Sequence, residues 1–483
     1  MKNRIKTLIF SMAALLGTVS CAAQQEAPKK AFKPDNASIS QHEVPAWYQD
    51  AKLGIFIHWG LYSVPGWAKA TELTLEETLE KDGGLTWFKE NPYAEWYLNS
   101  LKIDGSATQE YHRENYGEDY SYYDFVQPFN KAVADWDPQA MANLFKEAGA
   151  GYVVLTTKHH DGFLLWPSEH ENPFRENYYA SRDIVGELTS AVSDAGMKMG
   201  LYYSSGLDWT FNDKTITSLM DLFTAIPQDP AYAKYIDQHW RELMERYDPY
   251  VLWADIGSPQ AYDPVPLIAD FYNKNPEGVV NNRHKMEITP TGFGSPIHHD
   301  ILTPEYTVLD SISEKKWETC RGIGLSFGYN RREDVADFLS IDDLIDSFVD
   351  IVSKNGNLLL NVGPKADGSI PEGQRTRLEG LGRWLKQNGE AIYGTRPWKI
   401  AAAQTTEGTE VCFTAKGDAV YLTLLDRPEG STVSLQGLPI ESASQIESLA
   451  TGKAVRFNLE AGDLQLNFDE PESEAYTFRI TVR

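Results

Sequence analysis

The sequence predicts an α/β fold: a (β/α)8-like barrel of the TIM type, followed by a small C-terminal antiparallel β-sandwich. Three observations support this prediction. Between residues 53 and 394, short apolar runs alternate with amphipathic helical patterns, as strands and helices do in a barrel. Polar side chains stand at the ends of several runs, where barrels hold their functional groups. Beyond Pro397 the apolar period falls to two, as in Val420, Leu422 and Leu424, which is typical of a β-sandwich.

The length of the chain allows this organisation. With 483 residues it is too long for one ordinary compact domain, but a barrel of roughly 250 to 400 residues and one small domain would account for it. We place the barrel at residues 44–396 and the sandwich at residues 397–483. The sandwich contains no recognisable site, so its default role is that of a stabilising lid.

The N-terminus has the features of an export signal. Basic residues within the first six positions precede an apolar stretch, residues 8–19, and then small residues, so residues 1–21 are predicted to be a signal peptide. Thr-Val-Ser-Cys at positions 18–21 resembles a bacterial lipoprotein cleavage site, which would leave a lipid on Cys21 and attach the protein to a membrane. Residues 22–43 are polar and contain prolines, as flexible tethers do. We expect an exported protein, either periplasmic or lipid-anchored at the bacterial cell envelope.

The charge and the cysteine content exclude several classes of protein. With 44 basic and 69 acidic residues the net charge is −25, which argues against a nucleic-acid partner because phosphate binding requires positive charge. The cysteines, Cys21, Cys320 and Cys412, are too few for a disulfide scaffold and lack zinc-finger spacing. We expect Cys320 and Cys412 to be buried thiols.

The first predicted strand, Leu53–Gly60, is apolar and carries His58 near its end, as a buried strand that delivers a polar group would. The following stretch, residues 68–129, is aromatic, acidic and too long for a simple connection. It is therefore a candidate functional insertion. Its segment Asn-Pro-Tyr-Ala-Glu-Trp-Tyr makes Glu95 and Trp96 its residues of interest.

A helix is predicted over Pro138–Ala148, and a β-branched strand from Tyr152 then meets His159 and His160. Adjacent strand residues point to opposite faces, so both histidines can face one pocket only if the strand has broken or bulged. A zinc site would need further ligands at matching spacing, whereas imidazoles serve neutral sugar hydroxyls equally well. We favour the sugar interpretation and expect no metal and no cofactor.

The strand–helix alternation then leads to the central element of the chain. A helix at Asp183–Asp194, a strand at Met199–Ser205 that contains Tyr202, and a helix at Asp229–Tyr247 precede the apolar run Tyr250–Ser258. That run ends in a single carboxylate, Asp255. Because barrels keep catalytic groups at the carboxyl ends of their strands, the rest of the chain is expected to bring groups to this acid.

The remaining sequence supplies the other barrel elements. Glycines alternate with apolar residues over Arg321–Asn330, which predicts a strand closely approached by backbone or ligand, and Ser340 is a good N-cap for the helix after it. This interpretation gives seven strands and at least six helices between Leu53 and Gly394. The elements not yet named are a helix at 265–272, a strand at 279–283, a strand at 357–362 and a helix at 374–387.

The motifs narrow the chemistry. The sequence has no Walker loop, no Gly-x-Gly-x-x-Gly after a strand and no Gly-x-Ser-x-Gly elbow. What remains is a barrel whose strand ends carry carboxylates, histidines and aromatic rings. That set suits glycoside cleavage, in which one carboxylate attacks the anomeric carbon and a second protonates the departing oxygen.

A series of short motifs resembles the α-L-fucosidases of glycoside hydrolase family 29. The resemblance covers roughly residues 45–400, with a similar β-domain after it. The motifs are His-Trp-Gly at 58–60, Ala-Glu-Trp-Tyr at 94–97, Lys-His-His-Asp-Gly-Phe at 158–163, Leu-Tyr-Tyr-Ser at 201–204, Leu-Trp-Ala-Asp at 252–255, Asn-Arg at 282–283, Thr-Pro-Glu-Tyr at 303–306, Gly-Leu-Ser-Phe-Gly-Tyr-Asn at 324–330 and Gly-Asn-Leu-Leu-Leu-Asn-Val-Gly-Pro at 356–364.

The resemblance implies an exo-acting, retaining α-L-fucosidase that acts on fucosylated oligosaccharides or glycoconjugates without a metal. Asp255 would be the nucleophile and Glu305 the general acid/base, with Glu72, Glu95 and Glu318 as competitors for the second role. Phe327 would pack against the 5-methyl group of fucose. The residues implied to hold its hydroxyls and ring oxygen are His58, Glu95, Trp96, His159, His160, Tyr202, Trp253 and Arg283.

Two other functions stay open from the sequence. One is a fucose-binding, lectin-like barrel without turnover, and the other is a different retaining glycosidase, such as an α-galactosidase-like enzyme. The family pattern shows Met-Gly or a close variant soon after the catalytic aspartate, whereas this chain has Ile256, Gly257 and Ser258, a difference expected to touch the pocket wall. The sequence determines neither the linkage cleaved nor the oligomeric state.

Overall fold

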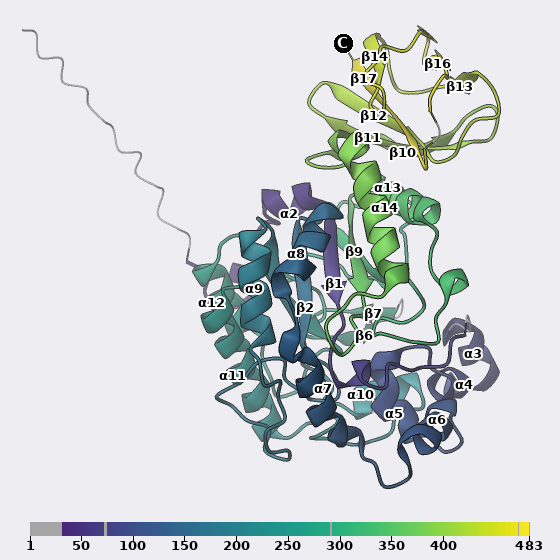
Figure 1. The fold of residues 1–483 in the computed structure, drawn as a ribbon. Coiled ribbons are helices and arrows are strands. Elements are labelled where there is room, and N and C mark those ends of the chain that lie inside the picture. Colours follow the sequence, from purple (N-terminus) through teal and green to yellow (C-terminus); the bar gives the residue numbers. More distant parts are fainter. Residues whose placement is uncertain (1–30, 72–74, 290–291, 472, 483) are drawn as a thin grey trace, which may run out of the picture.

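The computed structural model describes residues 31–71, 75–289, 292–471 and 473–482, and its centre is a curled parallel sheet (Figure 1). The seven strands pair in the order β5-β4-β3-β2-β1-β9-β8. This confirms the predicted barrel-like α/β fold. The strands are β1 (Leu53–Ile57), β2 (Tyr152–Lys158), β3 (Lys198–Ser204), β4 (Val251–Asp255), β5 (Val279–Val280), β8 (Trp317–Gly322) and β9 (Gly356–Val362).

An irregular segment, residues 301–305, completes the ring between β5 and β8. Ile301 bridges in parallel to Asn281, just after β5, and Leu302 bridges to Trp317 at the start of β8. Glu305 bridges to Cys320 farther along β8. The segment therefore takes the place of an eighth strand, and its backbone bonds bring Glu305 to the carboxyl ends of the strands.

Large rings fill the inside of the barrel because glycines leave room for them. A Cβ atom on Gly54 of β1 would lie 2.4 Å from the ring of Tyr152 on β2, so only glycine fits there. The interior cluster also includes Phe56, Tyr202 and Trp253, all almost fully buried. These rings form the floor beneath the polar residues at the strand ends.

The covering helices begin at the caps that the sequence marks. Asp137 and Asp229 each cap a helix whose first residue is proline, and the Ser340 side chain accepts a hydrogen bond from the backbone of Asp343. The helices around the sheet are α2 (Ala46–Ala51), α8 (Pro138–Glu147), α9 (Ile184–Asp194), α11 (Pro230–Tyr247), α12 (Val265–Lys274), α13 (Ile341–Ser353) and α14 (Glu372–Asn388).

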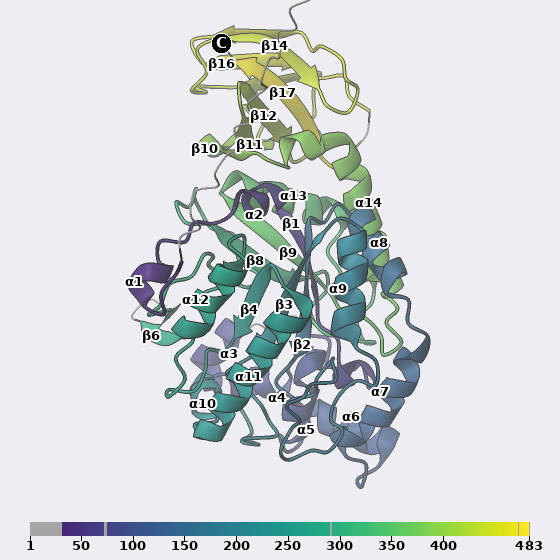
Figure 2. The same ribbon diagram turned by 90° about the vertical axis from the view of Figure 1, so that its left-hand side faces the viewer.

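The long insertion after β1 folds into short helices beyond the carboxyl ends of the strands, together with α10 (Leu219–Thr224), as Figures 1 and 2 show. A small hairpin, β6 (Glu287–Thr289) and β7 (Gly292–Gly294), lies in the connection after β5. The helices of the insertion are α3 (Leu75–Asp82), α4 (Leu85–Lys89), α5 (Tyr97–Leu101), α6 (Ala107–Tyr116) and α7 (Val126–Ala132).

The predicted strand at Arg321–Asn330 is wrong in its placement. The strand is β8, which ends at Gly322, and residues 323–330 form a loop. Gly322 marks the change, because a Cβ there would lie 2.7 Å from the carbonyl oxygen of Gly324, where the chain folds back on itself. The sequence of β8, Trp-Glu-Thr-Cys-Arg-Gly, looks polar although the strand is buried. Its Glu318 side chain points into the barrel and accepts hydrogen bonds there from Tyr48 and Trp253.

The N-terminal segment that the structure describes packs on the barrel, although residues 22–43 have the composition of a tether. It contains α1 (Asn36–Ile39), and the Phe32 backbone exchanges hydrogen bonds with the side chain of Asn273 on α12. His42 contacts Asp300. Within the described ranges, no helix combines the length and the apolar character needed to cross a membrane.

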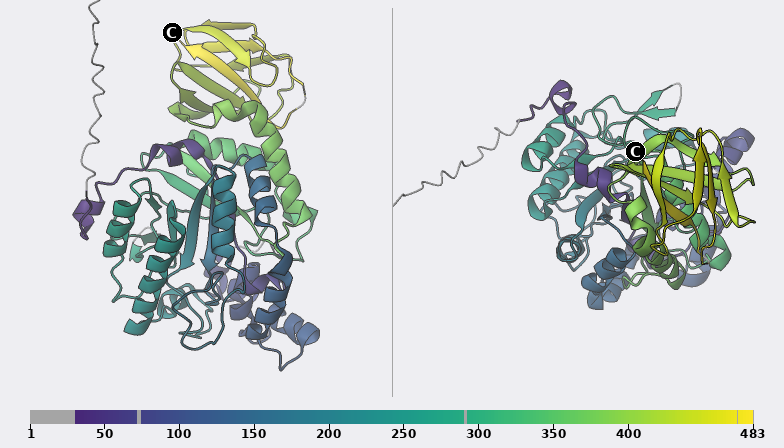
Figure 3. Two further views of the ribbon diagram at one scale, coloured as in Figure 1. Left: turned by 60° about the vertical axis from the view of Figure 1, so that its left-hand side comes forward. Right: turned by 90° about the horizontal axis from the view of Figure 1, so that it is seen from above.

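The C-terminal region is the predicted β-sandwich, with one five-stranded sheet, β10-β11-β12-β17-β14, and one three-stranded sheet, β13-β16-β15. It contacts α13 and, through Trp384, the C-terminal half of α14, and it lies at the end of the barrel opposite the insertion helices (Figures 1 and 3). It is therefore not a lid over the strand ends. Its strands are β10 (Arg396–Gln404), β11 (Glu410–Lys416), β12 (Ala419–Leu424), β13 (Thr432–Leu435), β14 (Ala443–Ser448), β15 (Phe457–Glu460), β16 (Asp463–Asn467) and β17 (Tyr476–Val482).

Candidate active site

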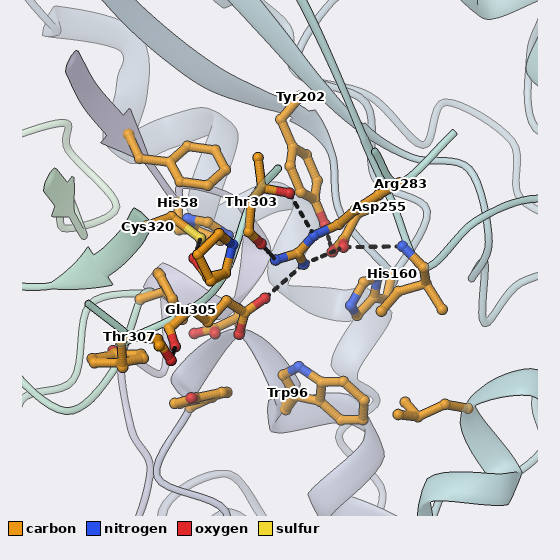
Figure 4. Close-up of a pocket in the computed structure, with 18 of the residues that line it drawn as sticks. His58, Trp96, His160, Tyr202, Asp255, Arg283, Thr303, Glu305, Thr307 and Cys320 are labelled. Atoms are coloured by element: carbon orange, nitrogen blue, oxygen red, sulfur yellow. Dashed lines mark hydrogen bonds and ion pairs between the residues drawn. The ribbon is translucent and has the colours of Figure 1, made fainter. Parts of the chain in front are cut away.

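A cavity of about 950 Å³ opens at the carboxyl ends of the barrel strands. Every residue that the sequence nominated for the site lines this cavity, although they come from eight different parts of the chain. Figure 4 shows its polar centre, where an arginine lies between two carboxylates. The lining residues nominated from the sequence are His58, Glu95, Trp96, His159, His160, Tyr202, Trp253, Asp255, Arg283, Glu305 and Phe327.

Asp255 is the last residue of β4 and is 8% exposed. Its Oδ2 accepts a hydrogen bond from the Tyr202 hydroxyl at 2.7 Å, and its Oδ1 accepts one from Arg283 Nη1 at 2.9 Å. Burial alone would raise the pKa of Asp255, but the positive charge of Arg283 and the donated hydrogen bonds outweigh it, so the pKa is lowered. Asp255 is therefore a buried carboxylate kept ionised by its donors.

The backbone turns sharply after Asp255. Ile256 has φ of 57° and Gly257 has φ of 75°, both in the left-handed region, which is unfavourable for a β-branched residue such as Ile256. In this turn the Ile256 N–H donates to Asp255 Oδ1 at 2.9 Å. Ile256 also lines the cavity, so the departure from the family pattern touches the pocket wall, as expected.

Arg283 joins the two candidate catalytic carboxylates. Its Nη1 donates to Asp255 Oδ1 at 2.9 Å and to Glu305 Oε1 at 2.6 Å. Because both oxygens bond to one nitrogen, they lie no farther apart than the sum of these two distances, about 5.5 Å. Retaining glycosidases separate their carboxyl groups by about 5 to 5.5 Å and inverting ones by about 6.5 to 9.5 Å. The upper limit of about 5.5 Å between the two oxygens agrees with the separation in retaining enzymes and is shorter than that in inverting ones.

The remaining nitrogens of Arg283 are held by Thr303, which receives hydrogen bonds from Nε and Nη2. Burial would lower the pKa of Arg283, but the charges of Glu305 and Asp255 outweigh it and raise the pKa above its usual range. All three nitrogens are thus committed to protein groups. The primary effect of Arg283 is to fix the carboxylates, whereas the family resemblance implied that it would hold the hydroxyls or ring oxygen of the sugar.

Glu305 lies on the segment that replaces an eighth strand, and its side chain is 40% exposed. Backbone bonds hold this part of the segment, since Cys320 N donates to Pro304 O and Tyr306 N donates to Cys320 O, each at 3.1 Å. The backbone of Glu305 is therefore fixed in position, while its side chain has access to solvent. Asp255 has no such access.

His58 follows β1 and donates from Nδ1 to Asn361 Oδ1 at 2.7 Å. The orientation of Asn361 is set because its Nδ2 donates to Phe327 O. Burial lowers the pKa of His58 to about 4, so the ring is neutral, and with Nδ1 protonated its Nε2 is an acceptor. His58 can therefore accept a hydrogen bond from a neutral hydroxyl.

His159 and His160 both line the cavity because β2 has ended before them. The strand stops at Lys158, after a register irregularity between Thr156 and Lys158, as the adjacent histidines required. His160 Nδ1 donates to Ser204 Oγ at 2.7 Å, and the Ser204 hydroxyl donates in turn to Leu207 O. Burial lowers the pKa of His160 to about 3, so its ring is also neutral.

Glu95 and Trp96 come from the 3-10 turn η2 (Ala94–Trp96) of the insertion. Glu95 is 2% exposed, and its Oε2 accepts a hydrogen bond from Gly328 N at 2.7 Å. Burial raises the pKa of Glu95 to about 7. Trp96 meets the rings of His160 and Trp209 edge-on. The insertion therefore supplies a polar group and an aromatic wall to the cavity.

Trp253 and Phe327 supply apolar surface. The indole N–H of Trp253 donates to Glu318 Oε1 at 3.0 Å, so it cannot bind a sugar hydroxyl as the family resemblance implied. Its ring lies 4.7 Å from the Arg283 guanidinium carbon. Phe327 is 5% exposed and packs beside the ring of His58, on the loop after β8.

The structure distinguishes Glu305 from the other glutamates that the sequence offered as general acid/base. Glu318 is fully buried at the floor of the barrel, where its oxygens accept hydrogen bonds from Tyr48, Tyr152 and Trp253, and it does not line the cavity. Glu72 lies outside the described residues. Glu95 lines the cavity, but the backbone of Gly328 holds it inside the buried wall.

The histidines of the cavity do not form a metal site among the described residues. Among the described residues, the His, Cys and acidic side chains that lie close enough together to hold an ion are His42, His298 and Asp300. None of the three lines the cavity. The predicted buried thiols are confirmed, since Cys320 and Cys412 are both free and buried.

The residues of the outer lining of the cavity were not named individually from the sequence. These residues come from α4, from α10 and from the segments around β5 and Glu305. Two of them could have been identified from the sequence, because Tyr93 stands in the same segment as Glu95 and Tyr306 in the same motif as Glu305. The others, among them Trp87, Leu219, Leu222, Phe223, Met286 and Leu309, belong to no motif.

The comparisons with known proteins agree with this chemistry. A model of the α-L-fucosidase family matches residues 19–390. A tissue α-L-fucosidase of Bos taurus is 34% identical over 440 residues, which cover 89% of this chain and 85% of the relative. An α-L-fucosidase of Dictyostelium discoideum is 32% identical over 479 residues, covering 93% and 95%.

Among solved structures, a Thermotoga maritima α-fucosidase in complex with a mechanism-based inhibitor superposes with a TM-score of 0.83. It is 42% identical, and the match covers 93% of this chain and all of the other. With a family match over most of the chain, the protein belongs to the α-L-fucosidase family and is a glycoside hydrolase.

Proposed function

We propose that this protein is an exo-acting, retaining α-L-fucosidase that removes terminal α-linked L-fucose from fucosylated glycans or glycoconjugates. The observation that carries the proposal is the sharing of Arg283 Nη1 by Asp255 and Glu305, which limits their oxygens to about 5.5 Å. That separation leaves room for a sugar carbon but not for an additional water in line. The buried inner end of the cavity suits the terminal residue of a chain.

In the first step, Asp255 Oδ attacks the anomeric carbon while Glu305 gives its proton to the glycosidic oxygen. The bond from carbon to the leaving group breaks, and a fucosyl ester of Asp255 forms. In the second step, Glu305 takes a proton from water, the water oxygen bonds to the anomeric carbon, and the ester breaks. Two displacements return the original configuration at that carbon.

The unlike surroundings of the two carboxyls suit these roles. Asp255 is buried and its pKa is lowered by Arg283, so it is ionised and aimed at the sugar. Glu305 is 40% exposed, so both the leaving group and the attacking water can reach it. Nucleophile and proton carrier are therefore distinguished by their environments.

Substrate recognition would combine neutral acceptors with apolar walls. The Nε2 atoms of His58 and His160 and the carboxyl group of Glu95 can accept from sugar hydroxyls, and His159 and Trp96 complete that ring. Phe327 and the face of Trp253 provide the apolar surface that a 5-methyl group would favour over a hydroxymethyl group.

Hydrolysis of an aryl α-L-fucoside by the wild type and by Asp255→Gly tests this proposal. The variant should lose at least about 10⁴-fold in kcat, because no other group can form the ester. Azide should restore turnover by entering the space of the missing carboxylate and yielding a fucosyl azide. Undiminished turnover by the variant would refute the role of Asp255.

Competition between fucose and galactose separates this function from an α-galactosidase-like one. L-Fucose is the 6-deoxy form of L-galactose, so D-galactose, the product of an α-galactosidase, has a ring of the opposite hand and also carries a hydroxyl on the carbon that corresponds to the methyl group facing Phe327. Fucose should therefore be the stronger product inhibitor. A protein that binds fucose tightly in calorimetry without any turnover would instead be a lectin-like barrel.

We also propose that the protein is exported and acts in the periplasm or from a lipid anchor on Cys21. The support is the sequence of residues 1–21, which lie outside the described residues. Cell fractionation of the wild type and of Cys21→Ala tests it. Membrane-bound wild type and released variant are expected, and equal distribution would argue against the anchor.

A further inference from the structure

The cavity is larger than the sugar that its inner end would hold. Pockets of roughly 300 to 1,000 Å³ accept whole drug-sized molecules of several rings. At about 950 Å³ this cavity is at the top of that range, whereas one deoxyhexose is a single ring. The space beyond the inner end is therefore part of the site and must receive another group.

The wall of this outer space is apolar. Its residues are Trp87 on α4, Leu219, Leu222 and Phe223 on α10, and Met286 and Leu309. The carboxylates and guanidinium of the lining, Glu95, Asp255, Arg283 and Glu305, all belong to the inner site, and the outer wall has no such charge among the described lining residues.

The helix α10 presents one face to this space. Leu219, Leu222 and Phe223 follow the i, i+3, i+4 spacing that places side chains on the same side of a helix. All three are half-buried, whereas Met220 is 59% exposed on the other side. Figures 1 and 2 place α10 beyond the carboxyl ends of the strands.

The position of Glu305 indicates which group would occupy the outer part of the cavity. A proton donor must contact the oxygen that joins fucose to its leaving group, so the leaving group lies on the solvent side of that oxygen. Glu305 is the exposed member of the catalytic pair, at the boundary between the inner residues and the apolar wall.

We propose that this outer wall, with Leu219 at its rim, is the leaving-group site, and that it selects uncharged leaving groups with an apolar face, such as an aryl ring or the flat face of a neutral sugar. The proposal rests on the proposed fucosidase function. An anionic leaving group would lose contact with this wall and would also meet the net charge of −25.

The test compares two substrates, 4-nitrophenyl α-L-fucoside and α-L-fucosyl fluoride. The fluoride leaves from the inner site without occupying the outer one. Leu219→Ser should lower kcat/KM for the nitrophenyl substrate about tenfold, mainly by raising KM, because an apolar contact with the ring is lost. Turnover of the fluoride should not change.

Matched variants on the same helix control the result. Met220→Ser changes the exposed face and should leave both substrates unaffected, and Leu219→Met should retain most of the wild-type activity. Leu219 is preferred to Leu222 and Phe223 because those two also pack against the hydrophobic core. Unchanged thermal unfolding confirms that the variants are folded.

Charge provides a second readout. Leu219→Lys should raise kcat/KM for a 4-carboxyphenyl α-L-fucoside, relative to that for its methyl ester, by about tenfold over the wild-type ratio. Comparing ratios between proteins cancels the different reactivity of the two leaving groups. An unchanged ratio would overturn the assignment of Leu219 to a site that discriminates charge.

The outcomes separate the two proposals. If the wild type cleaves both substrates and Leu219→Ser impairs both equally, or neither, the leaving-group site is wrong while the fucosidase function stands. If the wild type cleaves neither substrate, the fucosidase function fails, and the assignment of the leaving-group site fails with it.

Discussion

Two carboxyl groups in unlike surroundings are the residues on which the chemistry depends. Asp255 receives hydrogen bonds from Tyr202, Arg283 and the Ile256 backbone, and it is buried. Glu305 shares the same arginine nitrogen but is 40% exposed. The reaction therefore depends on a buried carboxylate, Asp255, that its donors hold in place, and on a second carboxyl group, Glu305, that the leaving group and water can reach.

The loss caused by Glu305→Ala should depend on the leaving group. A poor leaving group needs the proton, so its kcat should fall about 10² to 10⁴-fold, whereas an activated aryl leaving group departs without much help. A series of aryl α-L-fucosides of increasing phenol acidity measures this. Equal losses across the series would show that Glu305 is not the proton donor.

At the residue scale the sequence predicted which side chains meet but not all of their bonds. The apolar run that ends in Asp255 and the family motifs were sufficient to nominate the inner lining. They could not show that the indole N–H of Trp253 points down to Glu318, or that Arg283 has all of its nitrogens engaged by protein groups. Such bonds depend on partners far away in the sequence.

Among the elements, the segment at residues 301–305 is the decisive one, because it closes the ring and carries Glu305. Asp300, just before it, is held from several sides. Its Oδ2 accepts from the Tyr272 hydroxyl and from Val280 N, and its Oδ1 contacts His42 Nδ1 at 2.8 Å. The N-terminal segment therefore clamps the base of the element that positions the acid.

His42→Gln should destabilise the protein in a pH-dependent manner. Burial lowers the pKa of His42, but the hydrogen bond and charge of Asp300 outweigh it, so the folded-state pKa is raised above its usual value of 6.5. Its stabilisation is then complete below that value and is lost as the pH rises through the raised pKa. The wild type should exceed the variant by ~1–2 kcal/mol near pH 6 and by less near pH 9.

Urea unfolding at several pH values measures this difference. His299→Gln is a suitable control, because the ring of that histidine contacts the nearby backbone oxygen of Ile297 and its pKa is lowered, mainly by burial. A difference between the wild type and His42→Gln that grows with pH would contradict the clamp.

Elements with strong periodicity or clear caps were predictable, and the others were not. The helices after Asp137, Asp229 and Ser340 begin at the caps that the sequence shows. Strand β8 was placed too late because its buried Glu318 made it look polar, while the glycine-rich loop at 323–330 imitated a strand. The strand-like segment at 301–305 is defined only by bridges to distant residues.

For the whole molecule, the sandwich lies at the end of the barrel opposite the insertion helices and α10 (Figure 1), whose residues contribute to the lining of the active-site cavity. The sandwich is joined to the barrel by buried contacts such as the hydrogen bond from Thr414 Oγ1 to Ala391 O, at 2.7 Å. The indole N–H of Trp384 on α14 likewise donates to Ala475 O. This arrangement supports a role in stability, without contact to substrate.

Thr414→Val should lower stability by ~1–2 kcal/mol, because the Ala391 carbonyl loses its buried donor. Differential scanning calorimetry should show the lower Tm, while kcat/KM stays at the wild-type value. Thr423→Val, which removes a contact to Thr477 within the sandwich, is the matched control for loss of a hydroxyl. A several-fold change of KM in Thr414→Val would mean that the sandwich does communicate with the active site.

The geometry of the whole site leads to one stereochemical result. Proton NMR can follow the anomeric signal of the sugar first released from an aryl α-L-fucoside, before mutarotation scrambles it. Oxygens held within about 5.5 Å by one guanidinium nitrogen predict that α-L-fucose appears first. If β-L-fucose appeared first, water would have attacked directly, and the assignment of Asp255 as nucleophile would be contradicted.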